Sequence, residues 1–158
     1  MSGINAYNYK LRQVSETMEV SSKLASHFAN PERHMTGIYE LILNAIEHGN
    51  LEIGYERKAE LVRAGSWRQE IEQRILMPQY STRAVNIRLI HDDKTCCLTI
   101  SDDGHGFRWQ EYVRGIAAGK RPNGRGLLIA FNSNFDSIKF NDKGNAVTCI
   151  GKRKRASI

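Results

Sequence analysis

Three short stretches of this sequence carry residue types that could bind and process a phosphorylated ligand. The first, residues 39–50, spaces Glu40, Asn44 and His48 four apart, which places them on one face of a helix. An Asn oxygen can ligate magnesium, and a carboxylate one turn earlier can activate or orient a nucleophile at a terminal phosphate. The stretch alone fits a surface helix with a solvated polar stripe equally well.

The second stretch, DDGHGF at 102–107, puts a carboxylate beside two glycines. We expect Asp102 at a strand end, with Gly104 and Gly106 leaving room for a flat ring to enter. A carboxylate accepts a hydrogen bond from the exocyclic amine of adenine, whereas guanine presents a carbonyl there and two acceptors would face each other. The stretch therefore favours adenine over guanine.

The third stretch, NGRGLLIAF at 123–131, leads through glycines into an apolar run that we expect to be helical. Backbone amides at such a helix start can hold phosphate, because Gly124 and Gly126 tolerate positive φ and let a ligand approach closely. Each stretch taken alone is common in proteins for structural reasons. The nearby GIAAGK at 115–120 lacks the spacing and the Ser/Thr of a P-loop, and the sequence contains no HExxH or paired-cysteine metal motif.

The elements that must position these stretches follow from hydrophobic periodicity and turn residues. Capping and breaking residues predict a helix starting near Ser15, the motif helix from Pro31 to Gly49, and two short helices within 51–77, whereas 107–122 is expected to be irregular. Strands are expected at 7–14, 84–90, 95–101, 137–140 and 146–150. This order predicts an α+β fold, a two-layer α/β sandwich with a mostly antiparallel mixed sheet and helices on one face.

Composition predicts a single globular domain over residues 1–158, with 41% hydrophobic and 25% charged residues. No stretch reads as a signal peptide or membrane span, and three cysteines, two of them adjacent, fit neither disulfide nor metal spacing, so a cytoplasmic location without membrane contact is expected. The net charge of +6 raises nucleic acid as a partner. Much of this excess lies in the tail at 151–155, where a solvated basic end is favoured because no aromatic residues interleave with the charge.

Taken in order, ELILNAIEHGN, DDGHGF and GRGLLIA resemble the N-box, G1 box and G2 box of the GHKL superfamily. These Bergerat-fold ATPases have a histidine-kinase-like ATPase domain and include gyrase, Hsp90, histidine kinases and anti-sigma-factor kinases. The wording NAIEHGN and the ending FDSIKFNDKGNAVTCIGKRK are most similar to the bacterial anti-sigma-factor serine/threonine kinases. The resemblance extends over about residues 8–153.

The resemblance implies ATP and Mg²⁺ as cofactors and gives each motif residue a role. Asn44 takes the magnesium role, Glu40 the catalytic base role, and Asp102 the adenine-binding role beside Gly104 and Gly106. Residues 107–123 correspond to the lid over the nucleotide. The resemblance assigns further nucleotide contacts to His48, Gly124, Arg125, Gly126 and Leu127. For His48 we favour a core or ribose contact over a phosphate contact.

Two functions follow as hypotheses. The first is a protein kinase that transfers the ATP γ-phosphate to Ser/Thr of an anti-sigma-factor antagonist, and sequesters a sigma factor when free of it. The second is a non-catalytic ATP-binding switch that changes partner affinity with nucleotide. Glu40 favours the kinase, since a switch needs no base. Both hypotheses leave a homodimer open.

Overall fold

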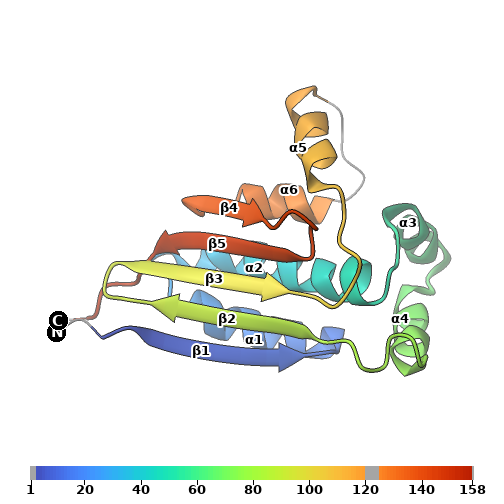
Figure 1. Ribbon diagram of the computed structural model, residues 1–158, viewed down its shortest axis with the longest axis horizontal. Coiled ribbons are helices and arrows are strands. Elements are labelled where there is room, and N and C mark those ends of the chain that lie inside the picture. Colours follow the sequence, from blue (N-terminus) through green and yellow to red (C-terminus); the bar gives the residue numbers. More distant parts are fainter. Residues whose placement is uncertain (1–2, 120–124, 158) are drawn as a thin grey trace.

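The computed structural model describes residues 3–119 and 125–157, with an antiparallel sheet whose one face is covered by helices (Figure 1). The strands, in spatial order, are β1 (Asn5–Leu11), β2 (Val85–His91), β3 (Thr95–Ser101), β5 (Ala146–Lys152) and β4 (Ser137–Phe140). All four neighbouring pairs are antiparallel. The α+β class is therefore confirmed, but the expected mixed sheet is not, since no parallel pair occurs among the described strands.

Alternating apolar residues give the sheet one buried face. Ile87 lies opposite Ile100, which lies opposite Val147 on the next strand, and all three are buried. Side chains two residues apart on a strand share a face, so these cross-strand rows form one continuous apolar surface. Figure 1 shows the helices α1 (Thr17–Ala25), α2 (Pro31–Asn44) and α6 (Arg125–Phe131) behind the sheet, where they cover this surface.

Helix α2 is the central element of the helical layer. It begins at Pro31 after Asn30, as the sequence predicts, and buries Ile38, Leu41 and Ile42 against the sheet. The helix does not stop at Asn44 but continues as a π-helical turn, η2 (Ala45–Asn50). The backbone thus stays helical to the end of the motif stretch, as the sequence predicts.

Helices α3 (Tyr55–Ala64) and α4 (Trp67–Leu76) follow η2 and lie beyond one end of the sheet (Figure 1). The sequence predicts both helices and the break between them, where Gly65 adopts φ +71° at the end of α3. This left-handed conformation suits glycine and ends the helix. Within the described residues, no helix is both long and apolar enough to cross a membrane.

Two predictions of secondary structure are wrong. The bounds of the first strand differ from the predicted 7–14, since β1 spans Asn5–Leu11. The strand ends at Leu11 because the Glu16 carboxylate accepts hydrogen bonds from the backbone N–H groups of Arg12 and Gln13, where the short 3₁₀ helix η1 (Val14–Glu16) begins. The stretch expected to be irregular contains α5 (Trp109–Ala117).

A tertiary contact holds the start of α5. The Trp109 indole donates a hydrogen bond of 2.9 Å to the backbone oxygen of Asn141, and its ring stacks on Phe140 with centroids 6.1 Å apart. Both partners lie about 30 residues away along the chain, so this contact cannot be predicted from the residues next to Trp109.

Candidate functional site

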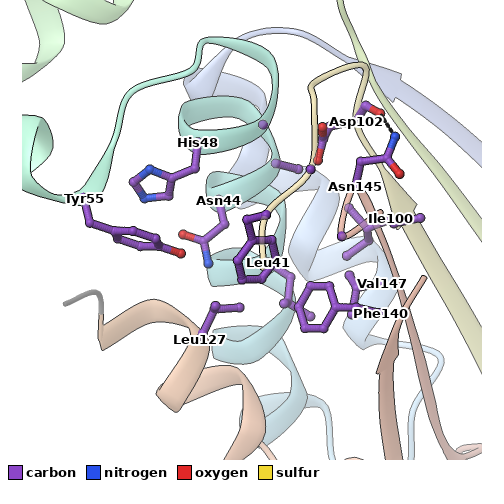
Figure 2. A pocket seen from close by; sticks show the side chains of 16 residues that line it. Leu41, Asn44, His48, Tyr55, Ile100, Asp102, Leu127, Phe140, Asn145 and Val147 are labelled. Atoms are coloured by element: carbon purple, nitrogen blue, oxygen red, sulfur yellow. Dashed lines mark hydrogen bonds between the residues drawn. The ribbon is translucent and has the colours of Figure 1, made fainter. Parts of the chain in front are cut away.

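Residues from the three motif stretches converge on one cavity (Figure 2). Asn44 reaches it from α2, Asp102 from the end of β3, and Leu127 from α6. Its apolar walls are formed by Leu41, Ala45, Ile100, Phe107, Phe140 and Val147. The cavity therefore has apolar walls with an acid at one end and an amide at the other.

Asp102 is held by the turn between β4 and β5. Its backbone N–H donates a hydrogen bond of 2.9 Å to the backbone oxygen of Asn145. The side-chain amide of Asn145 donates one of 3.3 Å to the backbone oxygen of Asp102 (Figure 2). Its carboxylate accepts the Gly104 N–H at 2.8 Å. Burial raises the pKa of Asp102 to about 6, with the Gly104 hydrogen bond opposing the rise. The group is thus ionised at neutral pH but close to its titration point.

The glycines beside Asp102 have different surroundings. A Cβ on Gly104 would lie 2.2 Å from the backbone oxygen of Gly49, and Gly104 is not part of the cavity lining. Gly106 does line the cavity, and a Cβ there would lie 1.8 Å from the backbone oxygen of Lys143. Gly104 is therefore needed for backbone packing, and only Gly106 borders the space where a ring could enter.

Gly49 and the residues near it position the acid, and the sequence indicated only a helix stop there. A Cβ on Gly49 would lie 2.3 Å from the Asp102 carboxyl carbon, so the missing side chain makes room for the carboxylate. The buried Asn50 accepts the Asp103 N–H at 2.8 Å, and Asp103 accepts the Ala84 N–H at 2.9 Å. These bonds tie the end of η2 to the acidic turn and to the start of β2.

At the other end of the cavity, Asn44 presents an unsatisfied amide. Its Nδ2 atom is buried and has no hydrogen-bond partner among the described residues. A buried amide without a partner costs free energy, and a half-turn of the amide brings its oxygen to the same place. The described residues contain no cluster of three or more His, Cys, Asp or Glu suited to a metal ion. A magnesium ion here would use Asn44 and depend on phosphate and water oxygens for its other ligands.

Helix α6 starts directly over Glu40 and Asn44. A Cβ on Gly126 would lie 2.7 Å from Glu40 Oε2 and 3.4 Å from the Asn44 amide atoms. Burial raises the pKa of the half-buried Glu40, and the positive charge of Lys58 opposes this. A carboxyl group with a raised pKa is a better proton acceptor near neutral pH than an exposed one.

His48 lines the cavity as a neutral ring. Its Nδ1 is hydrogen-bonded to the backbone oxygen of Ile53, and its ring packs on Tyr55 with centroids 4.0 Å apart. Burial lowers the pKa of His48 to about 4. Its Nε2 lies 3.9 Å from a Glu47 oxygen, which is a polar contact and not an ion pair for an uncharged ring. His48 therefore offers no positive charge to a phosphate, in line with the preference for a core or ribose contact.

An ion pair with a buried carboxylate connects α3 to η2, and it involves a helix where the sequence indicated no chemistry. The Glu47 side chain is fully buried, and its Oε2 accepts a 2.6 Å hydrogen bond from Lys58 Nζ. Burial raises the pKa of Glu47, and Lys58 opposes the rise. Lys58 Nζ also lies 5.8 Å from the ring centroid of Trp67, the first residue of α4. One lysine thus acts on two carboxylates, Glu40 and Glu47.

Part of the expected site lies outside the described residues. Gly124 falls there, as does the end of the expected lid, and nothing is described of the Arg125 side chain. The described part of the lid, residues 107–119, contains α5. The cavity volume is about 60 Å³, against roughly 300–1,000 Å³ for ligand sites in general, so a nucleotide would have to displace part of the lining.

No protein-family model matches this chain, and no curated protein sequence matches it. The functional assignment therefore depends on the geometry of the cavity and on the motifs that form it. Asp102 and Asn44 line this cavity, whereas the Glu40 carboxylate lies outside its lining, under the start of α6.

Proposed function

We propose that this chain binds magnesium-ATP in the cavity and transfers the γ-phosphate to Ser/Thr of a protein partner. It would do so as a Bergerat-fold kinase of the anti-sigma-factor type, which its motifs resemble. The observation that supports this is the meeting of Asn44, Asp102 and Leu127, from three ordered motifs, at one cavity. A two-layer α+β fold with helices on one face of the sheet is consistent with the family.

In this proposal, Asp102 selects the base. Its carboxylate accepts a hydrogen bond from the adenine amine, while Leu41, Ile100 and Val147 pack against the ring. The acceptor must be ionised, and the pKa of Asp102 is about 6. ATP affinity should therefore rise as the pH increases through 6.

Asn44 and Glu40 act at the phosphate end. Asn44 ligates magnesium, and magnesium-ATP supplies the γ-phosphoryl group. Glu40 accepts the proton of the attacking hydroxyl, whose oxygen forms the new bond to phosphorus while the bond to the ADP oxygen breaks. Lys58, which lowers the pKa of Glu40 against the effect of burial, would tune how readily Glu40 takes this proton.

The partners come from the resemblance alone. It suggests an anti-sigma-factor antagonist as the phosphate acceptor and a sigma factor as the protein held in its absence. A cytoplasmic location and a homodimer are consistent with the same resemblance. Nucleic acid is not needed by this function.

A second candidate is an ATP-binding switch without catalysis. Helix α5 extends away from the sheet (Figure 1), and Trp109 joins its first turn to Asn141 and Phe140. Nucleotide bound beneath such a helix would change its position and hence the surface offered to a partner. This function requires Asp102 and Asn44 but not Glu40.

Calorimetry tests the nucleotide proposal. We expect binding of ATP and ADP in magnesium and little binding of GTP, and equal affinity for GTP would contradict the adenine assignment. A pull-down with and without magnesium-ATP, followed by mass spectrometry, would identify the partner. Incubating that partner with labelled ATP then separates the two candidates. A kinase labels it, whereas a switch binds it in a nucleotide-dependent way and leaves it unlabelled.

A further inference from the structure

Charge is segregated between the two layers of the molecule. The chain has 17 Asp and Glu residues, and none of them lies in the five described strands. The strands contain four basic residues, namely Lys10, Arg88, Lys139 and Lys152. The net charge of +6 is therefore not spread evenly, because every acid lies in a helix or a connection.

All four strand cations point away from the helices. One row crosses the four strands β2, β3, β5 and β4, and its residues lie opposite one another in the order Arg88, Thr99, Thr148 and Lys139. This row lies on the side of the sheet opposite Leu89 and Leu98, which are buried. Lys10 and Lys152 occupy positions of the same parity on β1 and β5. All four are exposed, and none forms an ion pair among the described residues.

We call this side of the sheet the open face, and its three inner strands carry an apolar row next to the row of Arg88 and Lys139. Ile90 lies opposite Cys97, which lies opposite Ile150, so three neighbouring strands contribute one continuous row. Each of the three side chains is half-buried. Figure 1 is viewed onto the open face, and the labelled helices lie behind it or beyond its ends.

Strand aromatics are confined to the other side of the sheet. Tyr7, Tyr9 and Phe140 share the parity of the core residues, and Tyr7 stacks on His91 with centroids 5.8 Å apart. Bases of single-stranded nucleic acid are held by stacking on aromatic side chains, which the strands do not offer on the open face. A second copy of the chain would bring four cations against four cations.

We propose that the open face binds a protein whose surface is acidic around an apolar centre. The four cations attract the acidic rim, and the Ile90–Cys97–Ile150 row excludes water at the centre. A phosphate backbone could pair with the cations but would leave this apolar row uncovered. The proposal goes beyond the proposed function, since it concerns the side of the sheet opposite the cavity and does not depend on nucleotide.

The size of the open face predicts how tight such a complex is. Five strands spaced about 4.8 Å apart and about six residues long give an area of roughly 400 Å². A standard interface buries about 800 Å² per partner, so the open face alone supports a weak, transient complex. Attraction between exposed charges is screened over about 8–10 Å at physiological salt, so binding should weaken steeply as salt rises.

Two variants with equal net charge test the proposal. The first carries Lys10→Gln, Arg88→Gln, Lys139→Gln and Lys152→Gln on the open face. The matched control carries Arg33→Gln, Arg63→Gln, Arg68→Gln and Arg114→Gln, which are exposed positions on the helices α2, α3, α4 and α5. Polyglutamate serves as the acidic polypeptide probe and a DNA duplex as the nucleic-acid probe, both titrated at low and high salt.

Cys97 reports whether the probe occupies the open face. It is half-buried at the centre of this face, whereas Cys96 and Cys149 are fully buried and serve as internal references. We expect polyglutamate to slow maleimide modification of Cys97. We also expect the open-face variant to lose at least tenfold in polyglutamate affinity and the control variant to stay within about twofold of wild type.

Each other outcome would overturn the proposal. Equal loss in both variants would mean that only net charge matters, and unchanged Cys97 reactivity would mean that the probe binds elsewhere. Tighter binding of DNA with protection of Cys97 would make the face a nucleic-acid surface, and self-association lost in the open-face variant would make it a contact between copies. If the fourfold variant fails to unfold cooperatively, Arg88→Gln alone and the Cys97 measurement on wild type decide the matter.

Discussion

The two ends of the cavity are built in different ways. At the Asp102 end, backbone packs directly on backbone, and a Cβ on Gly104, Gly106 or Gly144 would lie 2.2 Å or less from a carbonyl oxygen. At the Asn44 end, side chains supply the surface, and one amide nitrogen is buried with no partner in residues 3–119 and 125–157. The first end is therefore a fixed shape, and the second end has polar capacity that a ligand could satisfy.

This difference also bears on the two glycines beside Asp102. Gly104 and Gly106 belong to the same short motif, yet only Gly106 lines the cavity. Both are required by the fold whether or not a ligand binds, because their neighbours leave no room for a side chain. Loss of binding in a glycine variant at this end would thus report unfolding, whereas loss at the Asn44 end would report chemistry.

Gly106→Ala should have the largest effect and should act on stability. The residue has φ +80°, and a Cβ would lie 1.8 Å from the Lys143 oxygen, so strain and overlap add. We expect the free energy of unfolding to fall by about 4 kcal/mol or more, measured by urea denaturation. The control is Gly115→Ala, where no atom of the described residues lies within 4 Å of the added Cβ and helix propensity favours alanine by about 1 kcal/mol. Equal stability of the two variants would show that the Asp102 end can rearrange.

Glu40→Gln should act on rate and leave stability and nucleotide binding near wild type. Loss of a general base typically costs 10²–10⁴-fold in rate, with little effect on ground-state binding. The measurement is phosphate transfer to the isolated partner, with ATP affinity determined in parallel. Glu32→Gln, at an exposed position in the first turn of α2, is the matched control. A Glu40 variant that still labels the partner at the wild-type rate would remove the kinase role from this residue.

Asp102→Asn should weaken ATP binding by roughly 1.5–3 kcal/mol, the value of a hydrogen bond to a charged group. The same change should raise stability. Burial raises the pKa of Asp102 to about 6 in the folded chain, above the unfolded value, so the folded state binds more protons between pH 4 and 6 and loses stability as pH rises through that window. Asparagine does not ionise, so the variant does not lose this stability as the pH rises.

The two consequences of Asp102→Asn are measured on the same samples. Calorimetry at pH 5 and pH 7.5 should show wild-type ATP affinity rising with pH and the variant lacking this rise. Urea denaturation should show the variant gaining most above pH 6. If the variant were less stable than wild type at pH 7.5, the carboxylate would be a structural group and not one retained for a ligand.

The strands and the motif helix could be predicted because their signals are local. Alternation of Val85, Ile87 and Leu89 defines the buried face of β2, and the Asn30–Pro31 pair marks the start of α2, as observed. Helix α5 escaped prediction because Trp109 is anchored by Asn141, a partner distant in sequence.

The residues that bring the three motifs to one cavity could be predicted from local sequence, but the residues that support them could not. Its motif residues have types that suggest chemistry on their own, whereas the support around them depends on packing. Gly49 makes room for Asp102, Asn50 fixes the acidic turn, and Lys58 pairs with Glu47, and none of these roles has a signature in local sequence. The place of His48, in contrast, was predicted from its spacing to Asn44, and both residues line the cavity.

Asn44→Ala should give the smallest effect on stability and the clearest on metal dependence. The Asn44 amide nitrogen is buried without a partner in the described part of the chain. Removing an unsatisfied buried group recovers about 1 kcal/mol or more of desolvation, offset in part by lost packing. The variant should therefore be as stable as wild type or slightly more so, although a half-buried side chain is truncated. If Asn44 ligates magnesium, ATP affinity of the variant should be the same with and without the ion, whereas wild type should bind more tightly with it.

Leu43→Ala is the control, since it truncates a buried neighbour in α2 that does not line the cavity. It should cost about 2–5 kcal/mol of stability and keep the magnesium dependence. The two variants together test whether the Asn44 end of the cavity differs from the Asp102 end in having an unsatisfied amide. Should Asn44→Ala destabilise the chain as much as Leu43→Ala, the amide would have a partner in solution. The Asn44 end would then be as fixed a shape as the Asp102 end.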